Sequence, residues 1–224
     1  MLAIFKREFK SYFQNVIGWL FVAALLAVYG LYFYVYNLKN GYPYISYDLN
    51  GIGFIMMIAV PILTMRSLSD EKKTKTDQLM LTSPVSVGRI VAGKYFAMAA
   101  VYTIDIALFA LSPLVLSIYG KVALSEAYVA LFGYWLYGLS CIAVGLFISS
   151  ISESVIISAI LTFAALFLSY MMQSITGLIS SSENLLTKVL NCFDLYTPFE
   201  NFVSGCFSVT SAAYYVTVIL LLCF

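Results

Sequence analysis

Six long apolar runs make up most of this chain, and one charged island interrupts them. The island, residues 66–94, holds six of the twelve Lys and Arg residues. Of all residues 62% are apolar and only 10% are charged, compared with roughly 25% charged in an average soluble domain. A chain of 224 residues cannot bury so much apolar surface in one aqueous globule. The sequence therefore predicts an all-α membrane protein, with a single transmembrane domain over residues 1–224.

Each apolar run is long enough, or nearly long enough, for a membrane-spanning helix of about 20 residues. Pro61 lies inside the second run and Pro113 inside the third, where a missing backbone N–H is expected to kink or interrupt the helix. The sixth run is short, so we expect a sixth span that is cut off at Phe224. The six expected spans cover residues 16–36, 49–68, 90–118, 128–149, 154–173 and 209–224.

Basic residues predict the orientation of these spans. Lys6, Arg7 and Lys10 precede the first span, and with the island they place nine of the twelve basic residues on one side. The remaining three stand singly in loops on the opposite side. Because basic loops stay in the cytoplasm, we expect a multi-pass protein of the inner (plasma) membrane with a cytoplasmic N-terminus.

Residues 1–15 form a separate amphipathic segment. Leu2, Phe5 and Phe9 recur at helical spacing, while the basic residues fall elsewhere around the helix. This pattern is typical of a helix that lies in the membrane interface. It serves either as a simple topology anchor or as an elbow that braces the bundle and touches a cytoplasmic partner.

The island is expected to contain a short helix over residues 69–83. Ser69 is a good N-cap before an acidic first turn, and Pro84 ends the helix because the residue before a proline avoids helical geometry. The helix begins charged and ends apolar at residues 79–81, Leu-Met-Leu. Such an apolar end suits docking into a groove on another protein. The alternative is a loop that lies on its own bundle.

These residues resemble the permeases of ABC transporters of the second exporter class. The hydropathy layout agrees over nearly the whole chain, and Gly-Leu-Phe-Ile-Ser-Ser at residues 145–150 is similar to a second signature of that class. Three further segments, residues 61–66, 76–79 and 199–202, look closest to the gliding-motility-associated branch. The island residues that carry the resemblance are Glu71-Lys72-Lys73-Thr74-Lys75-Thr76, Leu79, Leu81, Ser83-Pro84-Val85-Ser86 and Gly93-Lys94.

The resemblance implies a six-span subunit that works with a separate ATPase and with a second copy or a related permease. ATP and Mg would be bound by the ATPase, and no cofactor is expected in this chain. The helix at residues 69–83 would be the coupling helix, with Glu71 as the residue that senses ATPase movement. In agreement, the sequence has no G-x-x-x-x-G-K-[ST] phosphate-binding loop. The coupling residues implied by the resemblance are Glu71, Lys72, Thr76, Leu79, Leu81 and Pro84.

Asp105 is the one acid that the predicted spans place deep in the membrane. Tyr102 and Ser112 share its helical face, at spacings of three and seven residues. One interpretation puts this stripe on a translocation path or at a dimer seam. The other is a protonated Asp105 that hydrogen-bonds a neighbouring helix, which we favour because no basic residue lies at its level.

The segment of residues 176–208 is expected to face outward and to form short amphipathic helices. Cys192 and Cys206 lie in it, and the sequence leaves open whether they pair or remain free thiols. In the fourth span, Gly133, Gly138 and Gly145 predict close approach of neighbouring helices.

Other classes of function fit the sequence less well. The chain has no His, which removes the commonest general base and metal ligand, and no span holds a nucleophile–base pair. We expect neither an enzyme nor a metal site. A net charge of +1 argues against nucleic acid as a partner. The open alternatives are an ATP-independent secondary transporter, which would want more intramembrane charge or matched broken helices, and a non-transporting scaffold.

Overall fold

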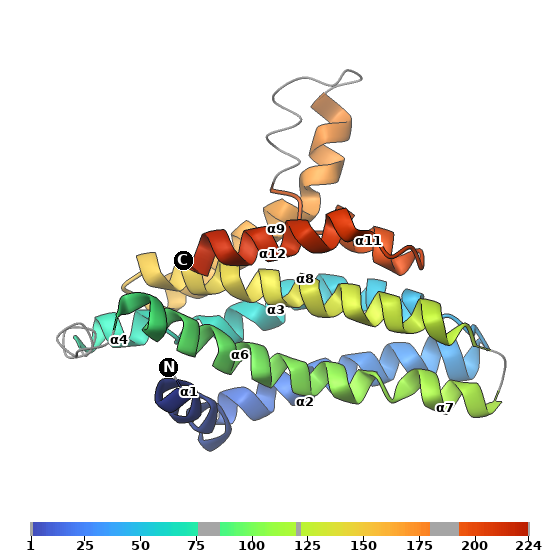
Figure 1. The fold of residues 1–224 in the computed structure, drawn as a ribbon, viewed down its shortest axis with the longest axis horizontal. Helices are drawn as coiled ribbons and strands as arrows, with labels where there is room; N and C mark the ends of the chain where they lie inside the picture. The colour runs from blue at the N-terminus through green and yellow to red at the C-terminus, as the bar shows by residue number, and fades with distance from the viewer. Residues whose placement is uncertain (1, 76–85, 120–121, 180–192, 224) are drawn as a thin grey trace.

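The computed structural model describes residues 2–75, 86–119, 122–179 and 193–223, and every regular element in these ranges is helical. The all-α prediction is confirmed. Figure 1 shows most of the helices running side by side along one long axis. In chain order the elements are α1 (Leu2–Gln14), α2 (Val16–Phe33), the π-helical turn η1 (Tyr34–Lys39), α3 (Ser46–Thr64), α4 (Ser69–Lys73), α6 (Val87–Phe109), α7 (Ser112–Tyr119), α8 (Leu124–Ile151), α9 (Val155–Ile179), α11 (Thr197–Val203) and α12 (Val209–Cys223).

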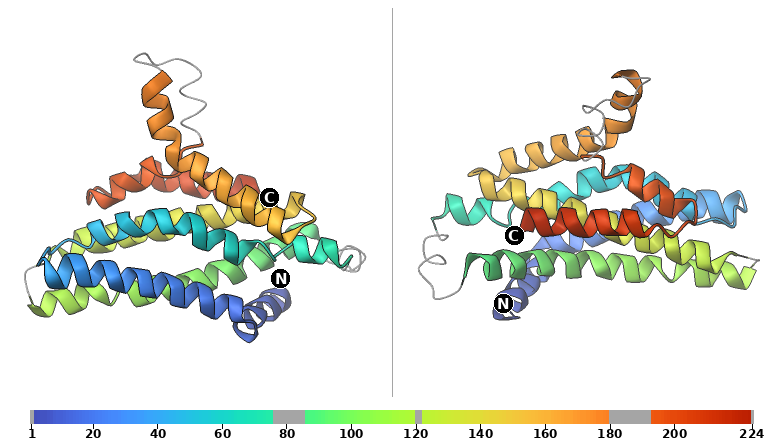
Figure 2. Two further views of the ribbon diagram at one scale, coloured as in Figure 1. Left: turned by 180° about the vertical axis from the view of Figure 1, so that it is seen from behind. Right: turned by 45° about the horizontal axis from the view of Figure 1, so that its top comes forward.

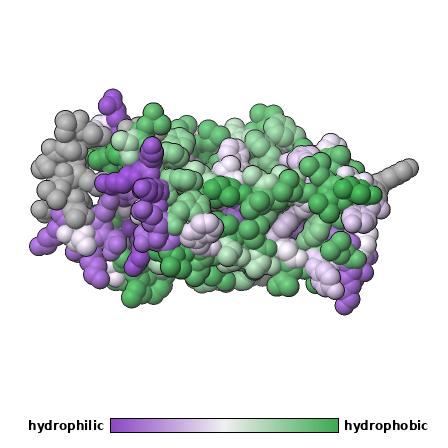
Figure 3. Space-filling model, turned by 90° about the horizontal axis from the view of Figure 1, so that it is seen from below, coloured by the Kyte–Doolittle hydropathy of each residue, from purple (hydrophilic) through white to green (hydrophobic). Residues whose placement is uncertain are grey.

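Five helical segments in the described ranges are long and apolar enough to cross a membrane. They are Val16–Lys39, Ser46–Lys73, Val87–Tyr119, Leu124–Ile151 and Val155–Met172. The sixth apolar helix, α12, has 15 residues and packs against α8, so the sixth span stays a prediction. Figure 3 shows a broad apolar belt between two polar ends, and the larger polar area lies at the end that holds α1 and α4. This distribution fits a protein that spans a bilayer.

The centre of the bundle is α8, which packs against α3, α6, α9, α11 and α12. The three predicted close approaches are confirmed, because a Cβ atom on any of these glycines would collide with a neighbouring side chain. Small residues let helices approach closely where lipid supplies no hydrophobic driving force. The contacts are Gly133 with Phe202, Gly138 with Tyr102, and Gly145 with Thr64.

The two prolines in the spans act differently. Helix α3 continues through Pro61 and ends three residues later at Thr64. The third span is interrupted, because α6 ends at Phe109 and α7 begins at Ser112. Pro113 has no N–H for the carbonyl of Phe109, and the Ser112 hydroxyl donates to that carbonyl instead, at 2.7 Å.

Helix α1 crosses the end of the bundle at a steep angle to its long axis (Figures 1 and 2). Asn15 has an extended backbone, with φ −89° and ψ 155°, and separates α1 from α2. The aromatic residues of α1 form a row, with ring centroids 5.9 Å apart for Phe5 and Phe9 and 5.0 Å apart for Phe9 and Phe13. The helix packs against α6 and α2, which joins it to the bundle.

The island begins differently from the prediction. Helix α4 ends at Lys73, and Lys75 has a φ of 55°, in the left-handed region that interrupts a helix. Ser69 does not cap α4, because Leu68 is the N-cap and makes no side-chain cap bond. The Ser69 hydroxyl instead hydrogen-bonds Ser149 at the end of α8. Residues 76–83 of the predicted coupling helix lie outside the described residues.

The segment after α9 is anchored to the bundle in the part that is described. Asp194 accepts hydrogen bonds from the backbone of Tyr196 and Thr197 at 2.9 and 3.0 Å, and Tyr215 donates to the carbonyl of Leu195 at 2.7 Å. Cys206 is an exposed free thiol. Whether it pairs with Cys192 in a disulfide is not tested, because residue 192 lies outside the described residues.

Candidate functional site

A network of alternating charges joins α1, α4 and α6 at the polar end of the bundle. Lys94, in the second turn of α6, is only 2% exposed. Its Nζ donates to Glu71 Oε1 and to the carbonyl of Ser67, both at 2.7 Å, and lies 3.6 Å from Glu8 Oε1. A buried ammonium group costs several kcal/mol unless it is paired. The carboxylates and the carbonyl are therefore what allows Lys94 to lie here.

Arg7 closes the network from the solvent side. Its Nη2 lies 2.7 Å from Glu8 Oε1 and 3.8 Å from Glu71 Oε1. The Arg7 side chain is 58% exposed, so its pairs are screened and contribute little by themselves. Glu71 therefore has a basic residue from α1 on one side and one from α6 on the other.

Ser149, at the end of α8, holds the start of α4. Its hydroxyl oxygen accepts hydrogen bonds from the backbone N–H groups of Leu68 and Ser69, both at 3.2 Å. The Ser69 hydroxyl lies 3.0 Å from the Ser149 hydroxyl and donates to the Ser149 carbonyl at 3.1 Å. Lys72 Nζ donates to the carbonyl of Ser150. A cation at the C-terminus of a helix also complements the helix dipole, so α4 is fastened to α8 by hydrogen bonds and by charge.

A polar pocket of about 590 Å³ lies between these elements. Tyr12 of α1 lines it and donates to the carbonyl of Leu63 at 3.4 Å. Burial, together with the nearby carboxylates of Glu8 and Glu71, raises the pKa of Tyr12 above its usual value, so the hydroxyl stays protonated. The twelve lining residues are Arg7, Glu8, Ser11, Tyr12, Asn15, Ile17, Arg66, Ser67, Asp70, Glu71, Thr74 and Lys94.

The predicted coupling residues fall partly on this network. Glu71 contacts Lys94 and Arg7, and Lys72 contacts α8. Thr76, Leu79, Leu81 and Pro84 lie outside the described residues. Their partners Glu8, Lys94 and Ser149 were not predicted. The Gly-Lys end of the island was a signal for Lys94 and the Ser-Ser end of residues 145–150 for Ser149, whereas Glu8 had none.

The residues of the predicted translocation stripe are all buried. Tyr102 and Asp105 are 0% exposed and Ser112 is 8% exposed. Tyr102 donates to the carbonyl of Tyr134 at 2.7 Å, and Ser112 pairs with the hydroxyl of Tyr29. Among the described residues, neither carboxylate oxygen of Asp105 has a hydrogen-bond partner. The expected hydrogen bond from Asp105 to a neighbouring helix is therefore not found among the described residues. The break after Phe109 places Ser112 on a separate helix from Tyr102 and Asp105.

A second acid of a spanning segment, Asp48, is also buried, although it lies at the start of its span and not deep in it. Asp48, in the first turn of α3, is 0% exposed and accepts a hydrogen bond from Asn37 of η1. The sequence placed Asp48 just outside the second span, so its burial was missed. The π-helical turn that brings Asn37 to it has no clear sequence signal.

The fold and the site define a class of protein, a multi-pass α-helical membrane protein whose N-terminal helix is joined by charge to α4. A family model described as ABC-2 family transporter protein matches residues 32–224. The chain belongs to this family, and it is a permease subunit of an ABC transporter. The family implies an ABC ATPase as a partner in general. A comparison with curated proteins gives no significant match.

Proposed function

We propose that this permease couples ATP hydrolysis by a separate ATPase subunit to export or to a gliding-motility or secretion machine. The α1–α4–α6 junction carries this coupling. The observation that carries the proposal is the ion pair between Lys94 and Glu71, with Arg7 and Glu8 beside it. Through these contacts a displacement of the island reaches α1 and α6, and through Ser149 it reaches α8.

The orientation supports the proposal. The N-terminal helix and α4 lie at the same polar end (Figures 1 and 3). Nine of the twelve basic residues fall in the N-terminal segment and the island. In our account this end faces the cytoplasm of a cell with the protein in its inner membrane, where a cytoplasmic ATPase supplied with ATP and Mg would bind. The resemblance of the island to coupling loops supports the same assignment.

The apolar end of the island would seat the ATPase. Leu79, Leu81 and Pro84 suit a groove on a nucleotide-binding subunit, as the resemblance implies. Lys72 and Thr76 lie between the acidic start and this apolar end. A second permease copy or a related permease completes the proposed assembly.

Affinity purification in mild detergent tests the proposal. The wild-type chain is expected to bring down an ABC ATPase and a second permease. Leu79→Asp would place a charge in an apolar groove, at a cost of roughly several kcal/mol, and should release the ATPase while the permease stays inserted. Leu79→Met, which keeps an apolar side chain of similar volume at the same position, is the matched control and should keep the ATPase. Equal recovery of the ATPase with wild type and Leu79→Asp would contradict the assignment of the island as the coupling segment.

A further inference from the structure

The polar pocket at the α1–α4–α6 junction holds two charges of opposite sign that the network does not use. Arg66 and Asp70 both line the pocket. In the part of the chain that the structure describes, neither side chain has a hydrogen bond or an ion pair. They are four residues apart, but the chain turns between the end of α3 at Thr64 and the start of α4, so they do not pair as they would along one helix.

The other charges of the pocket are already balanced. Lys94, Glu71, Glu8 and Arg7 satisfy one another, as described above. The pocket therefore presents one guanidinium and one carboxylate toward a space of about 590 Å³, which is within the ~300–1,000 Å³ of small-molecule sites. Neutral donors also line it, namely the hydroxyl of Ser11 and the amide of Asn15. A ligand that carries both an anion and a cation would complement these groups.

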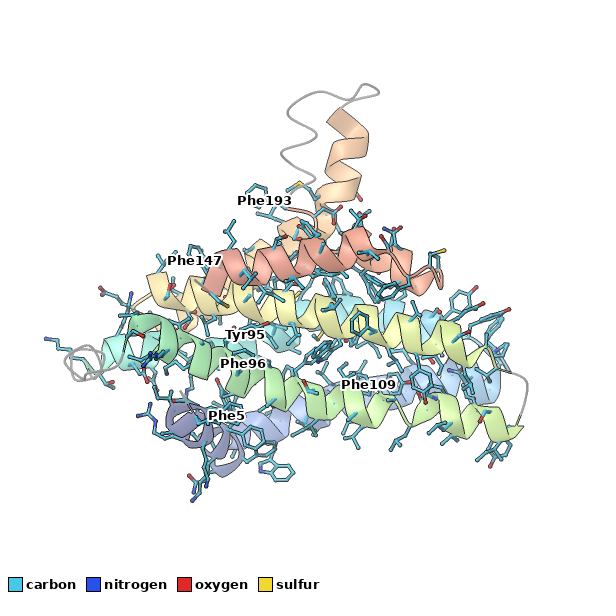
Figure 4. The ribbon with its side chains drawn as sticks, viewed as in Figure 1. Phe5, Tyr95, Phe96, Phe109, Phe147 and Phe193 are labelled. Carbon is cyan, nitrogen blue, oxygen red and sulfur yellow. The ribbon has the colours of Figure 1, made fainter. Side chains whose placement is uncertain are left out.

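An apolar groove lies beside this pocket and is lined partly by α1 and α6. It has a volume of about 540 Å³ and is lined by Phe5 of α1, by Tyr95 and Phe96 of α6, and by Trp135 of α8. Figure 4 shows Phe5 beside Tyr95 and Phe96 on this side of the bundle. Tyr95 follows Lys94 directly in α6, so the charged pocket and the apolar groove border the same turn. An occupant of both has a charged head and a hydrocarbon chain.

We propose that the α1–α4–α6 junction binds a phospholipid with a zwitterionic headgroup. The phosphate lies against Arg66, which presents a fork of N–H donors, and the headgroup amine lies against Asp70. One acyl chain follows the groove along Phe5 and Phe96. The lipid braces α1 against α6 at the depth where an amphipathic helix meets the headgroups. This lipid site uses Arg66 and Asp70, which the ion pairs of the proposed coupling junction do not use, so the proposal does not rest on ATPase binding.

Because Arg66 and Asp70 would contact different parts of the headgroup, their substitutions should affect different lipids. The purified permease is delipidated in detergent and titrated with phosphatidylethanolamine or with anionic phosphatidylglycerol, and bound lipid is counted by native mass spectrometry. Arg66→Gln should weaken the binding of both lipids by roughly tenfold, because both carry a phosphate. Asp70→Asn should weaken phosphatidylethanolamine by a similar factor and leave phosphatidylglycerol unchanged, because only the former has an amine.

Lys73→Gln is the matched control, because Lys73 is an exposed basic residue that does not line the pocket. It should leave the binding of both lipids unchanged. Circular dichroism confirms that each variant is folded. If Asp70→Asn affects both lipids equally or neither, recognition of a zwitterion is overturned. Soluble phosphoethanolamine distinguishes the source of the headgroup chemistry: binding as tight as that of the lipid would show that the site takes a free phosphorylated amine and would overturn a lipid site.

Discussion

Lys94 and Glu71, which are 23 residues apart in the sequence, meet in an ion pair of 2.7 Å between Nζ and Oε1. The Lys94 side chain is 2% exposed and the Glu71 side chain 20% exposed. Because an ammonium group this buried is stable only with a partner, the pair fixes the start of α6 to α4. Ser149 fixes α4 to α8 in turn, so the short helix is tied to two spans.

The hydrogen bonds between Ser149 and the start of α4 should contribute measurably to the free energy of unfolding. Ser149→Ala removes the acceptor of two backbone N–H groups, a buried one at Ser69 and a partly buried one at Leu68. We expect the free energy of unfolding to fall by about 1–3 kcal/mol, measured by thermal or denaturant unfolding in detergent. Ser150→Ala is the control, because the Ser150 hydroxyl donates only within its own helix, to Phe147. Equal stability of the two variants would contradict a stabilising role for the Ser149 hydrogen bonds.

The contact between Ser69 and Ser149 also shows what could not be predicted from the sequence. The spans follow from local apolar runs, and five of the six expected spans reach membrane-crossing length. The glycine contacts of α8 were likewise predictable, because a small residue in a lipid-embedded helix has few other uses. Ser69 and Ser149 are 80 residues apart, and nothing local shows that they pair. The local signal at Ser69 favoured an N-cap, and the tertiary contact replaced it.

The charged residues show the same limit. Lys94, at the start of the third expected span, was counted among the basic residues that predict orientation, because a lysine near the start of a span usually reaches water. Its burial depends on Glu71 and Glu8, which come from two other helices. Asp48 was missed for a related reason, because its partner Asn37 lies on a π-helical turn. Pairing of polar groups between distant segments requires the assembled bundle.

Close packing of α6 on α8 should be sensitive to one methyl group. In Gly138→Ala the new Cβ would collide with the ring of Tyr102, which also donates to the carbonyl of Tyr134. We expect a loss of about 1–3 kcal/mol of stability from overpacking. Gly30→Ala in α2 meets nothing within 4 Å and should be neutral or slightly stabilising. A Gly138→Ala protein with unchanged thermal stability would show that the helices separate easily at this level.

Asp105 should tolerate loss of its charge. If it is a protonated group in a dry interior, Asp105→Asn keeps a neutral side chain of the same size. Assembly, measured by size-exclusion chromatography with the ATPase, and ATP turnover are both expected to match the wild type. Normal assembly with lost activity would instead place Asp105 on the working path of the transporter.

Orientation can be tested by thiol labelling in intact cells. In a chain whose four native cysteines are replaced, a cysteine at Lys73 should react with an impermeant maleimide only after the cells are permeabilised. A cysteine at Tyr42, which is 49% exposed in the loop after η1, should react at once. Reversed labelling would place the island outside the cell and would remove it from any cytoplasmic ATPase.

Force transmission through Glu71 is the central claim, and distance measurement between α1 and α8 tests it most directly. Spin labels at Gln14 and Ile151, both exposed, report the separation of these helices in the complex with the ATPase. Addition of ATP should change the distance in the wild type and in the control Lys73→Gln. In Glu71→Gln the ATPase should remain bound, but the distance should no longer respond to ATP. An ATP-dependent change in Glu71→Gln equal to that of the wild type would contradict the account.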